Sequence, residues 1–160
     1  MELAKEDNSK TPSSFCTICT NSCKQELVLW VLTLSIHHEN ANVYIMCDSE
    51  SKEAIDNLTP NVNERLNINW LVELDEYSNK TRKEMEDEKT WSDFQMKKAE
   101  VMSRALEKEE DTLFLDSDII ILDKINDVNK NMDLGVSPQF IKDENVKEVG
   151  YYNGGMLWTK

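Results

Sequence analysis

The chain contains few residues that break regular structure, and it is poor in positive charge. Its 160 residues include four glycines and three prolines, which excludes a collagen-like or low-complexity protein. Lysine and arginine total 18 against 31 aspartates and glutamates, so the formal net charge is −13. Because nucleic acids and anionic membranes are bound by basic surfaces, this balance argues against both as main partners. It is compatible with a small phosphorylated ligand held by a few local donors.

Long apolar runs are also missing. A membrane-spanning helix needs about 20 apolar residues, whereas the longest run, Leu27 to Ile36, is much shorter and contains Thr33 and Ser35. The polar N-terminus lacks the apolar segment of a secretory signal. We therefore predict a cytoplasmic protein without a membrane span. Hydrophobic residues, at 39%, suffice for one globular core.

The apolar patterns predict a flexible polar tail over residues 1–13 and a single domain over residues 14–160. Strands are predicted at 15–20, 42–47, 68–74, 112–115, 132–136 and 151–159, and helices at 24–38, 51–58 and 91–108. Ser22 and Gln25 fit a capping box for the first helix. The mixed charges of residues 75–90 predict an exposed loop. Alternating strands and helices predict an α/β fold, with a mostly parallel sheet covered by helices on both faces.

Three of the four cysteines are close in sequence, at positions 16, 19 and 23. This spacing suggests zinc or an iron–sulfur cluster. However, Cys16 and Cys19 lie in one predicted strand at opposite parity, so their side chains point to opposite faces. We therefore interpret the cysteines as small buried residues.

The segment FLDSDIIIL places two carboxylates, Asp116 and Asp118, just after an apolar strand. If the strand continues, residues two apart point the same way, about 6 to 7 Å apart. Two such carboxylates can share Mg²⁺ or Mn²⁺, whereas the simpler interpretation is a polar turn with two solvated aspartates. In parallel sheets ligands bind at the carboxyl ends of strands, where Thr20, Asn21 and Asp48 are also expected.

Lys98 lies in the middle of an otherwise apolar helical stripe. At about 100° per residue, this stripe collects Trp91, Phe94, Val101, Met102 and Ala105. A lysine centred on a buried face needs an anion or must extend to water. A ligand phosphate or Asp116 would supply that anion.

The segment YYNGGMLW is a strong strand pattern interrupted by Asn153, Gly154 and Gly155. Glycine inside a strand marks the close approach of a ligand or another backbone, or else an ordinary bulge or turn. No phosphate-binding Gly-Lys-Ser/Thr loop and no Gly-x-Gly-x-x-Gly pattern occurs.

Together these segments resemble the GT-A-fold glycosyltransferases, and among them the glycogenin-like nucleotide-diphospho-sugar transferases. FCTICTN is similar to the family's first strand, KKAEVMSRALEKEEDTLFLDSDIIIL to its helix and Asp-x-Asp strand, and YYNGGMLWT to a later Asn-containing strand. The resemblance covers roughly residues 15–160. Two departures stand out. Lys24 occupies a position that is often aromatic in the family, and the segment supplying a histidine ligand and acceptor-binding carboxylates has no counterpart before Lys160.

The resemblance implies a role for each matched residue. Thr20 and Asn21 would hold the nucleotide base, and Lys98 would contact the donor phosphates. Asp116 would contact ribose and metal, and Asp118 the metal, with Mn²⁺ or Mg²⁺ as cofactor. The donor sugar would lie against Asn153, Gly154 and Gly155.

The leading hypothesis is therefore a glycosyltransferase that moves a hexose from a nucleoside diphosphate sugar, most simply a UDP-sugar, to an unknown acceptor. One alternative is an inactive nucleotide-sugar-binding or interaction remnant. Another is a haloacid-dehalogenase-like phosphatase, although Ile119 and Ile120 replace the small residue usual after its second aspartate. Because the strand at 151–160 is apolar on both faces, we also expect self-association or a partner chain there, with little turnover by the isolated chain.

Overall fold

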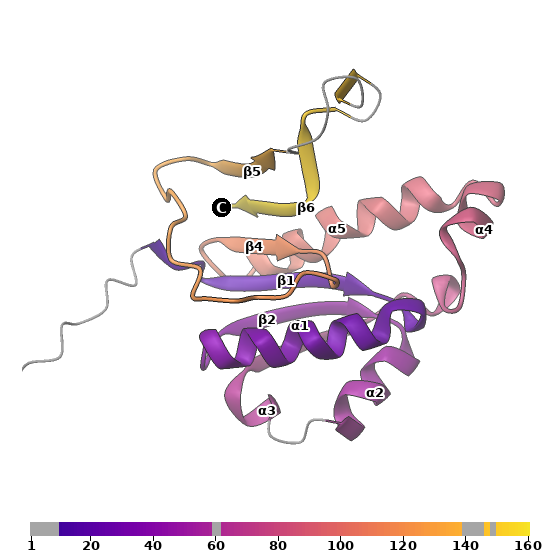
Figure 1. The fold of residues 1–160 in the computed structure, drawn as a ribbon, viewed down its shortest axis with the longest axis horizontal. Helices are drawn as coiled ribbons and strands as arrows, with labels where there is room; N and C mark the ends of the chain where they lie inside the picture. The colour runs from indigo at the N-terminus through magenta and orange to yellow at the C-terminus, as the bar shows by residue number, and fades with distance from the viewer. Residues whose placement is uncertain (1–9, 59–61, 139–145, 148–149) are drawn as a thin grey trace, which may run out of the picture.

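The computed structural model describes residues 10–58, 62–138, 146–147 and 150–160, and these form an α/β fold around one sheet. The strands are β1 (Ser14–Cys19), β2 (Asn42–Cys47), β3 (Asn67–Val72), β4 (Thr112–Leu115), β5 (Leu134–Pro138) and β6 (Tyr152–Thr159). They lie in the order β3-β2-β1-β4-β6-β5. The first four are mutually parallel, whereas β6 runs antiparallel to β4 and β5, as Figure 1 shows. The predicted fold class is confirmed.

Helices cover both faces of the sheet (Figure 1). They are α1 (Lys24–His37), α2 (Ser49–Leu58), α3 (Val62–Arg65), α4 (Arg82–Asp87) and α5 (Trp91–Leu106). On one face, Leu27, Trp30 and Leu34 of α1 pack among the core residues of β1, β2 and β4. On the other face, Val101 and Ala105 of α5 pack with Cys16 and Phe114. Because Cys16 and Cys19 belong to different faces, the parity argument for these cysteines is confirmed.

The chain reverses its direction of sheet growth between β1 and β4. From β1 it proceeds outward to β2 and β3, and it then returns to place β4 on the other side of β1. Ligands of open α/β sheets bind at the carboxyl ends of strands at such a switch point. Residues directly after β1 and β4 are therefore favourably positioned for a binding site.

Residues 75–90 are not the exposed loop that their charge predicted. They contain the 3₁₀ turn η3 (Asp75–Tyr77) and helix α4, and they bury Tyr77 and Met85 against the α5 face. Helix α4 begins with a capping box in which the Thr81 hydroxyl and the Glu84 carboxylate bond reciprocally to backbone N–H groups. The Thr-x-x-Glu pattern of this capping box is present in the sequence, but the high density of charged residues around it led to the prediction of a loop.

The capping box predicted from Ser22 and Gln25 is absent from α1. A 3₁₀ turn, η2 (Asn21–Cys23), comes first, and Cys23 occupies the N-cap position without a side-chain hydrogen bond. Ser22 Oγ instead lies 3.1 Å from Thr20 Oγ1. Because of this turn, α1 begins at Lys24, one residue after the start that a cap at Ser22 requires.

Ser13, the last residue of the predicted flexible tail, is held to the domain by hydrogen bonds. Residues 1–9 lie outside the described residues, but Ser13 donates from its backbone N–H and its hydroxyl to the buried Asp111 carboxylate, at 2.8 and 2.9 Å. Trp158 Nε1 donates to the same carboxylate at 3.1 Å, and Lys130 pairs with it at 2.9 Å. These hydrogen bonds, opposing the effect of burial, hold the pKa of Asp111 below its usual value.

The strand β6 is an inner strand of the sheet, with β4 on one side and β5 on the other. The apolar faces of residues 151–160 are therefore partly covered, because Met156 and Trp158 pack on one core cluster and Leu157 on the other. The outer edge belongs to β5. Association through residues 151–160 stays a prediction. None of the described helices is long and apolar enough to cross a bilayer.

Candidate functional site

A pocket of about 310 Å³ opens at the carboxyl ends of β1 and β4, at the switch point of the sheet. Its lining comes from the end of β1, the start of α1, one face of α5 and the turn after β4: Ile18, Cys23, Glu26, Trp91, Phe94, Gln95, Lys98, Asp116, Ser117 and Asp118. Its volume is at the lower end of those known for small-molecule sites. The pocket combines apolar walls with four charged side chains, which is the composition expected for a polar ligand.

Lys98 is the basic group of this pocket. Its Nζ pairs with Asp116 Oδ1 at 2.7 Å and donates to the Gly154 carbonyl oxygen at 3.4 Å. The ammonium also lies 5.3 Å from the centroid of the Phe114 ring, within range of a cation–π interaction. The Lys98 side chain is only 16% exposed and that of Asp116 35% exposed. The lysine on the apolar stripe thus meets an anion of the protein itself.

The geometry of the Asp-Ser-Asp segment differs from the continued strand that we assumed. Strand β4 ends at Leu115, and Ile119 N–H bonds back to the Asp116 carbonyl oxygen at 3.1 Å, so residues 116–119 form a turn. The same-side argument for the two aspartates is therefore wrong, because a turn does not preserve the two-residue period. Both carboxylates nevertheless line the pocket, with Asp116 half-buried and Asp118 exposed.

At Gly155 the Asp116 carboxylate occupies the space that a side chain would need. A Cβ at Gly155 would lie 2.6 Å from Asp116 Oδ2, closer than real Cβ contacts come. The two backbones are joined here as well, since Asp116 N–H donates to the Gly155 carbonyl oxygen at 2.8 Å. At Gly154, by contrast, an added Cβ would meet nothing within 4 Å. The predicted close approach at this glycine pair thus involves a side chain of the site.

Asn153 begins an irregular part of β6 rather than interrupting the strand. Val136 of β5 pairs with Leu157, but the next residue, Ser137, pairs with Asn153, so residues 154–156 have no partner in β5. In Figure 1, β6 bends where it enters the sheet. The Asn153 side-chain oxygen accepts a hydrogen bond from Gly155 N–H at 2.8 Å. Asn153 is exposed. Neither Asn153 nor Gly154 or Gly155 lines the pocket, although Gly155 contacts the Asp116 carboxylate that does.

Thr20 and Asn21 lie directly after β1 but do not line the pocket. Thr20 is buried, and Asn21 N–H donates to the carboxylate of Asp48 at 2.7 Å. Asp48 is fully buried, and hydrogen bonds from Ser51, Ser78 and Asn21 outweigh that burial and lower its pKa. Asp48 therefore fixes the backbone of this turn. The Asn21 side-chain oxygen is buried and has no partner among the described residues.

Carboxylates outnumber ammonium groups in the pocket. Glu26, Asp116 and Asp118 face a single lysine, Lys98. Among the residues that the structure describes, no cluster of three or more His, Cys, Asp or Glu side chains could hold a metal ion. Two carboxylates are nevertheless the usual protein contribution to a Mg²⁺ site that takes its other ligands from water and substrate phosphates. Carboxylate oxygens are suitable ligands for such a cation, and its binding by Asp116 and Asp118 stays a prediction.

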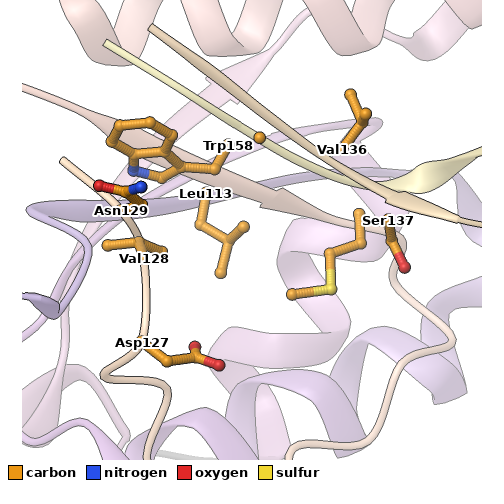
Figure 2. A pocket seen from close by; sticks show the side chains of 9 residues that line it. Leu113, Asp127, Val128, Asn129, Val136, Ser137 and Trp158 are labelled. Atoms are coloured by element: carbon orange, nitrogen blue, oxygen red, sulfur yellow. The ribbon is translucent and has the colours of Figure 1, made fainter. Parts of the chain in front are cut away.

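A second pocket, of about 270 Å³, lies against the opposite end of β4 and beneath β5 and β6 (Figure 2). Leu113, Val128, Val136, Met156 and Trp158 supply most of its wall, and Asp127 is its one charged residue. It lacks a cationic group, so it is poorly suited to a phosphorylated ligand. The pocket at the switch point, by contrast, contains Lys98 together with three carboxylates.

Several lining residues of the site were not predicted as functional. Phe94 and Trp91 precede Lys98 by four and seven residues, and both line the pocket while packing partly buried against the core cluster on the α5 face. Their helical spacing from Lys98 is a signal that the sequence contains. Glu26 and Cys23 reach the pocket only because η2 and α1 follow β1 closely. Nothing in their local pattern marks them.

A family model matches this chain over residues 16–116, from β1 to the end of β4. It describes the phosphoadenosine phosphosulfate reductase domain. Since the match covers more than half of the chain, the chain belongs to this family. The match ends at Asp116, so it contains neither Asp118 nor the strands β5 and β6. A search of curated proteins found no match.

Solved structures similar to this chain include two glycosyltransferases. Mouse xyloside xylosyltransferase 1, in its apo form, has a TM-score of 0.63 at 10% identity, over 91% of this chain and 66% of that chain. The galactosyltransferase LgtC, in complex with donor and acceptor sugar analogues, has a TM-score of 0.55 at 11% identity, over 91% and 57% respectively. The fold is therefore GT-A-like. The chain spans less than two thirds of the length of either protein.

Proposed function

We propose that this chain is a glycosyltransferase domain of the glycogenin-like type. It would bind a nucleoside diphosphate sugar, most simply a UDP-sugar, in the pocket at the switch point and transfer the hexose to an acceptor. The observation that carries the proposal is the ion pair of Lys98 with Asp116, enclosed at the end of β4 and facing Gly155. An ammonium and a carboxylate held at this place provide one group for phosphate and one for a cation.

The excess of carboxylates supports metal dependence. A diphosphate entering a pocket that contains Glu26, Asp116 and Asp118 meets more negative than positive charge. Mn²⁺ or Mg²⁺ held by Asp116 and Asp118 would neutralise this excess negative charge and would offset the charge that develops on the diphosphate leaving group. Lys98 would then release Asp116 and donate to the phosphates, which stabilises the leaving group further.

The remaining parts of the donor would lie on either side of this centre. Thr20 and Asn21 are proposed for the base, and the unpartnered side-chain oxygen of Asn21 supplies an acceptor for an N–H of that base once its side chain turns. Asn153, Gly154 and Gly155 are proposed for the hexose. The exposed amide of Asn153 and the open space around Gly154 are compatible with a sugar there.

The family assignment supports a second candidate. Membership in the phosphoadenosine phosphosulfate reductase domain family favours an adenine nucleotide bound at the ends of β1 and β4. Both candidates place a phosphorylated nucleotide in the same half of the sheet. They differ in the base, in the need for a cation and in the use of Asp118, which the family match does not include.

Isothermal titration calorimetry with UDP, GDP and phosphoadenosine phosphosulfate, each with and without Mn²⁺, distinguishes these candidates. The glycosyltransferase proposal expects UDP to bind only when Mn²⁺ is present. Equal UDP affinity with and without the cation would contradict the proposal. Metal-independent binding of phosphoadenosine phosphosulfate alone would favour the second candidate. A donor-hydrolysis assay then separates an active transferase from a domain that binds the donor without turnover.

A further inference from the structure

Two sulfur atoms meet at the end of β1, beside the candidate pocket. Cys19 Sγ and Cys23 Sγ lie 3.2 Å apart. Both are also within hydrogen-bonding distance of the Thr20 carbonyl oxygen, at 3.2 and 3.4 Å. The sulfurs of a disulfide are about 2.05 Å apart. Forming one here would therefore draw the two sulfurs about one ångström closer, across the turn η2 that ends at Cys23.

The two thiols differ in their access to solvent. Cys19 is fully buried, whereas Cys23 is partly exposed and lines the pocket. Cys16 and Cys47, the other cysteines of the chain, are fully buried. A small oxidant that enters the pocket therefore meets Cys23 first, with Cys19 directly behind it.

The electrostatic environment favours the same order of reaction. The hydrogen bond with Cys19 lowers the pKa of Cys23 to about 6 despite burial, and a hydrogen bond from Ser117 contributes to the lowering. That shared hydrogen bond and burial raise the pKa of Cys19. Thiolates are the nucleophilic form of cysteine. The exposed member of the pair is thus also the more nucleophilic member at neutral pH.

We propose that Cys19 and Cys23 form a reversible disulfide when the protein meets a peroxide. The Cys23 thiolate attacks one peroxide oxygen and becomes a sulfenic acid, and the other oxygen leaves as hydroxide and is protonated to water. Cys19 sulfur then attacks Cys23 sulfur, and the sulfenic oxygen leaves as water with the thiol proton. The two sulfurs lose two electrons in total, and the peroxide gains them. An external thiol reverses the reaction by exchange.

The disulfide would also alter the candidate site, a consequence that rests on the proposed function. Ser117 donates its hydroxyl hydrogen bond to Cys23 Sγ at 3.8 Å, and Ser117 separates Asp116 from Asp118. Thr20 and Asn21 lie within the loop that the disulfide would close. Drawing the sulfurs together therefore moves the turn proposed for the base and removes a contact of the Asp-Ser-Asp turn.

The disulfide can be tested without any nucleotide. The full chain is treated with stoichiometric hydrogen peroxide, its free thiols are counted, and its tryptic peptides are sequenced by mass spectrometry. We expect the loss of two of the four thiols, and an intrachain Cys19–Cys23 link in the peptide between Lys10 and Lys24. Cys16→Ala, which removes a buried thiol of the same strand, should leave this link intact, whereas Cys23→Ala should prevent it. Four free thiols after treatment, a different pairing, or oxidation of Cys23 beyond sulfenic acid without a link would overturn the proposal.

A second measurement tests the consequence. UDP affinity in the presence of Mn²⁺ is compared between the reduced and the oxidised chain, and we expect it to fall on the order of tenfold on oxidation. Affinity should return after reduction with dithiothreitol. If UDP binds neither form, the proposed function fails while the thiol mapping still decides the disulfide. If UDP binds both forms equally, the disulfide has no effect on the site and this part of the inference is wrong.

Discussion

Replacing Lys98 with methionine should weaken nucleotide binding strongly and stability only slightly. A hydrogen bond to a charged group contributes about 1.5–3 kcal/mol. However, the Asp116 side chain is 35% exposed and regains water when its partner is lost, so we expect a net stability cost below about 1 kcal/mol. Methionine also retains the apolar contacts of the lysine stem. Loss of about 1–3 kcal/mol of phosphate interaction corresponds to a roughly 5- to 150-fold weaker Kd.

The neighbouring lysine provides a matched control. Lys97 pairs with Glu100 at 2.8 Å on the same helix and does not line the pocket. The control variant is therefore Lys97→Met. Urea unfolding should show that Lys97→Met and Lys98→Met both fold, and calorimetry with UDP and Mn²⁺ should show that only Lys98→Met binds UDP poorly. Mn²⁺ alone should bind Lys98→Met more tightly than the wild type, because Asp116 is released from its ion pair. Equal UDP affinity in the two variants would refute a phosphate-binding role of Lys98.

Three further changes test other parts of the site and the fold. Asp118→Asn should abolish the Mn²⁺ dependence of UDP binding in calorimetry, and retained dependence would show that Asp118 is only a solvated turn residue. Gly155→Ala should lower Mn²⁺-dependent UDP affinity by about tenfold or more, because its methyl group displaces the Asp116 carboxylate, whereas Gly154→Ala should bind UDP nearly as the wild type does. Burial lowers the pKa of His38 to about 4, and its Nε2 accepts a hydrogen bond from Ile125 N–H. Since the unfolded chain takes up the proton first, near the usual histidine pKa of about 6.5, stability should fall as the pH drops from 6.5 towards 4. Urea midpoints of His38→Gln should show a flatter dependence over that range, and parallel curves would contradict this assignment.

Local patterns in the sequence determined which residues form the inner strands and which helix face meets the sheet. The apolar runs at 42–47 and 112–115 match β2 and β4, because a strand covered on both faces must be apolar throughout. The two-residue period placed Cys16 and Cys19 on opposite faces. The helical period placed Lys98 on the packed side of α5. These features depend on neighbours within a few residues, so one segment is enough to indicate them.

Local patterns failed where a turn or a distant segment competes with the regular period. The turn at residues 116–119 removes the strand geometry assumed for Asp116 and Asp118. The buried Tyr77 and Met85 lie among charges that suggested a loop. No local sequence pattern indicates the contacts among residue 98 on α5, residue 116 after β4 and residue 155 on β6. Their contact follows from the order of strands in the sheet, with β6 inserted beside β4, and that order is set by the packing of the whole chain.

The sequence by itself therefore determined the chemistry available at the site: one lysine on an apolar stripe, two aspartates after a strand and two adjacent glycines. Only the tertiary structure decided that the lysine pairs with Asp116, that Gly155 leaves room for that carboxylate, and that the thiols of Cys19 and Cys23 lie in contact. The physical reason is the range of the interactions. Side-chain periodicity acts over one or two turns of chain, whereas an ion pair or a steric contact needs two segments brought together by the sheet.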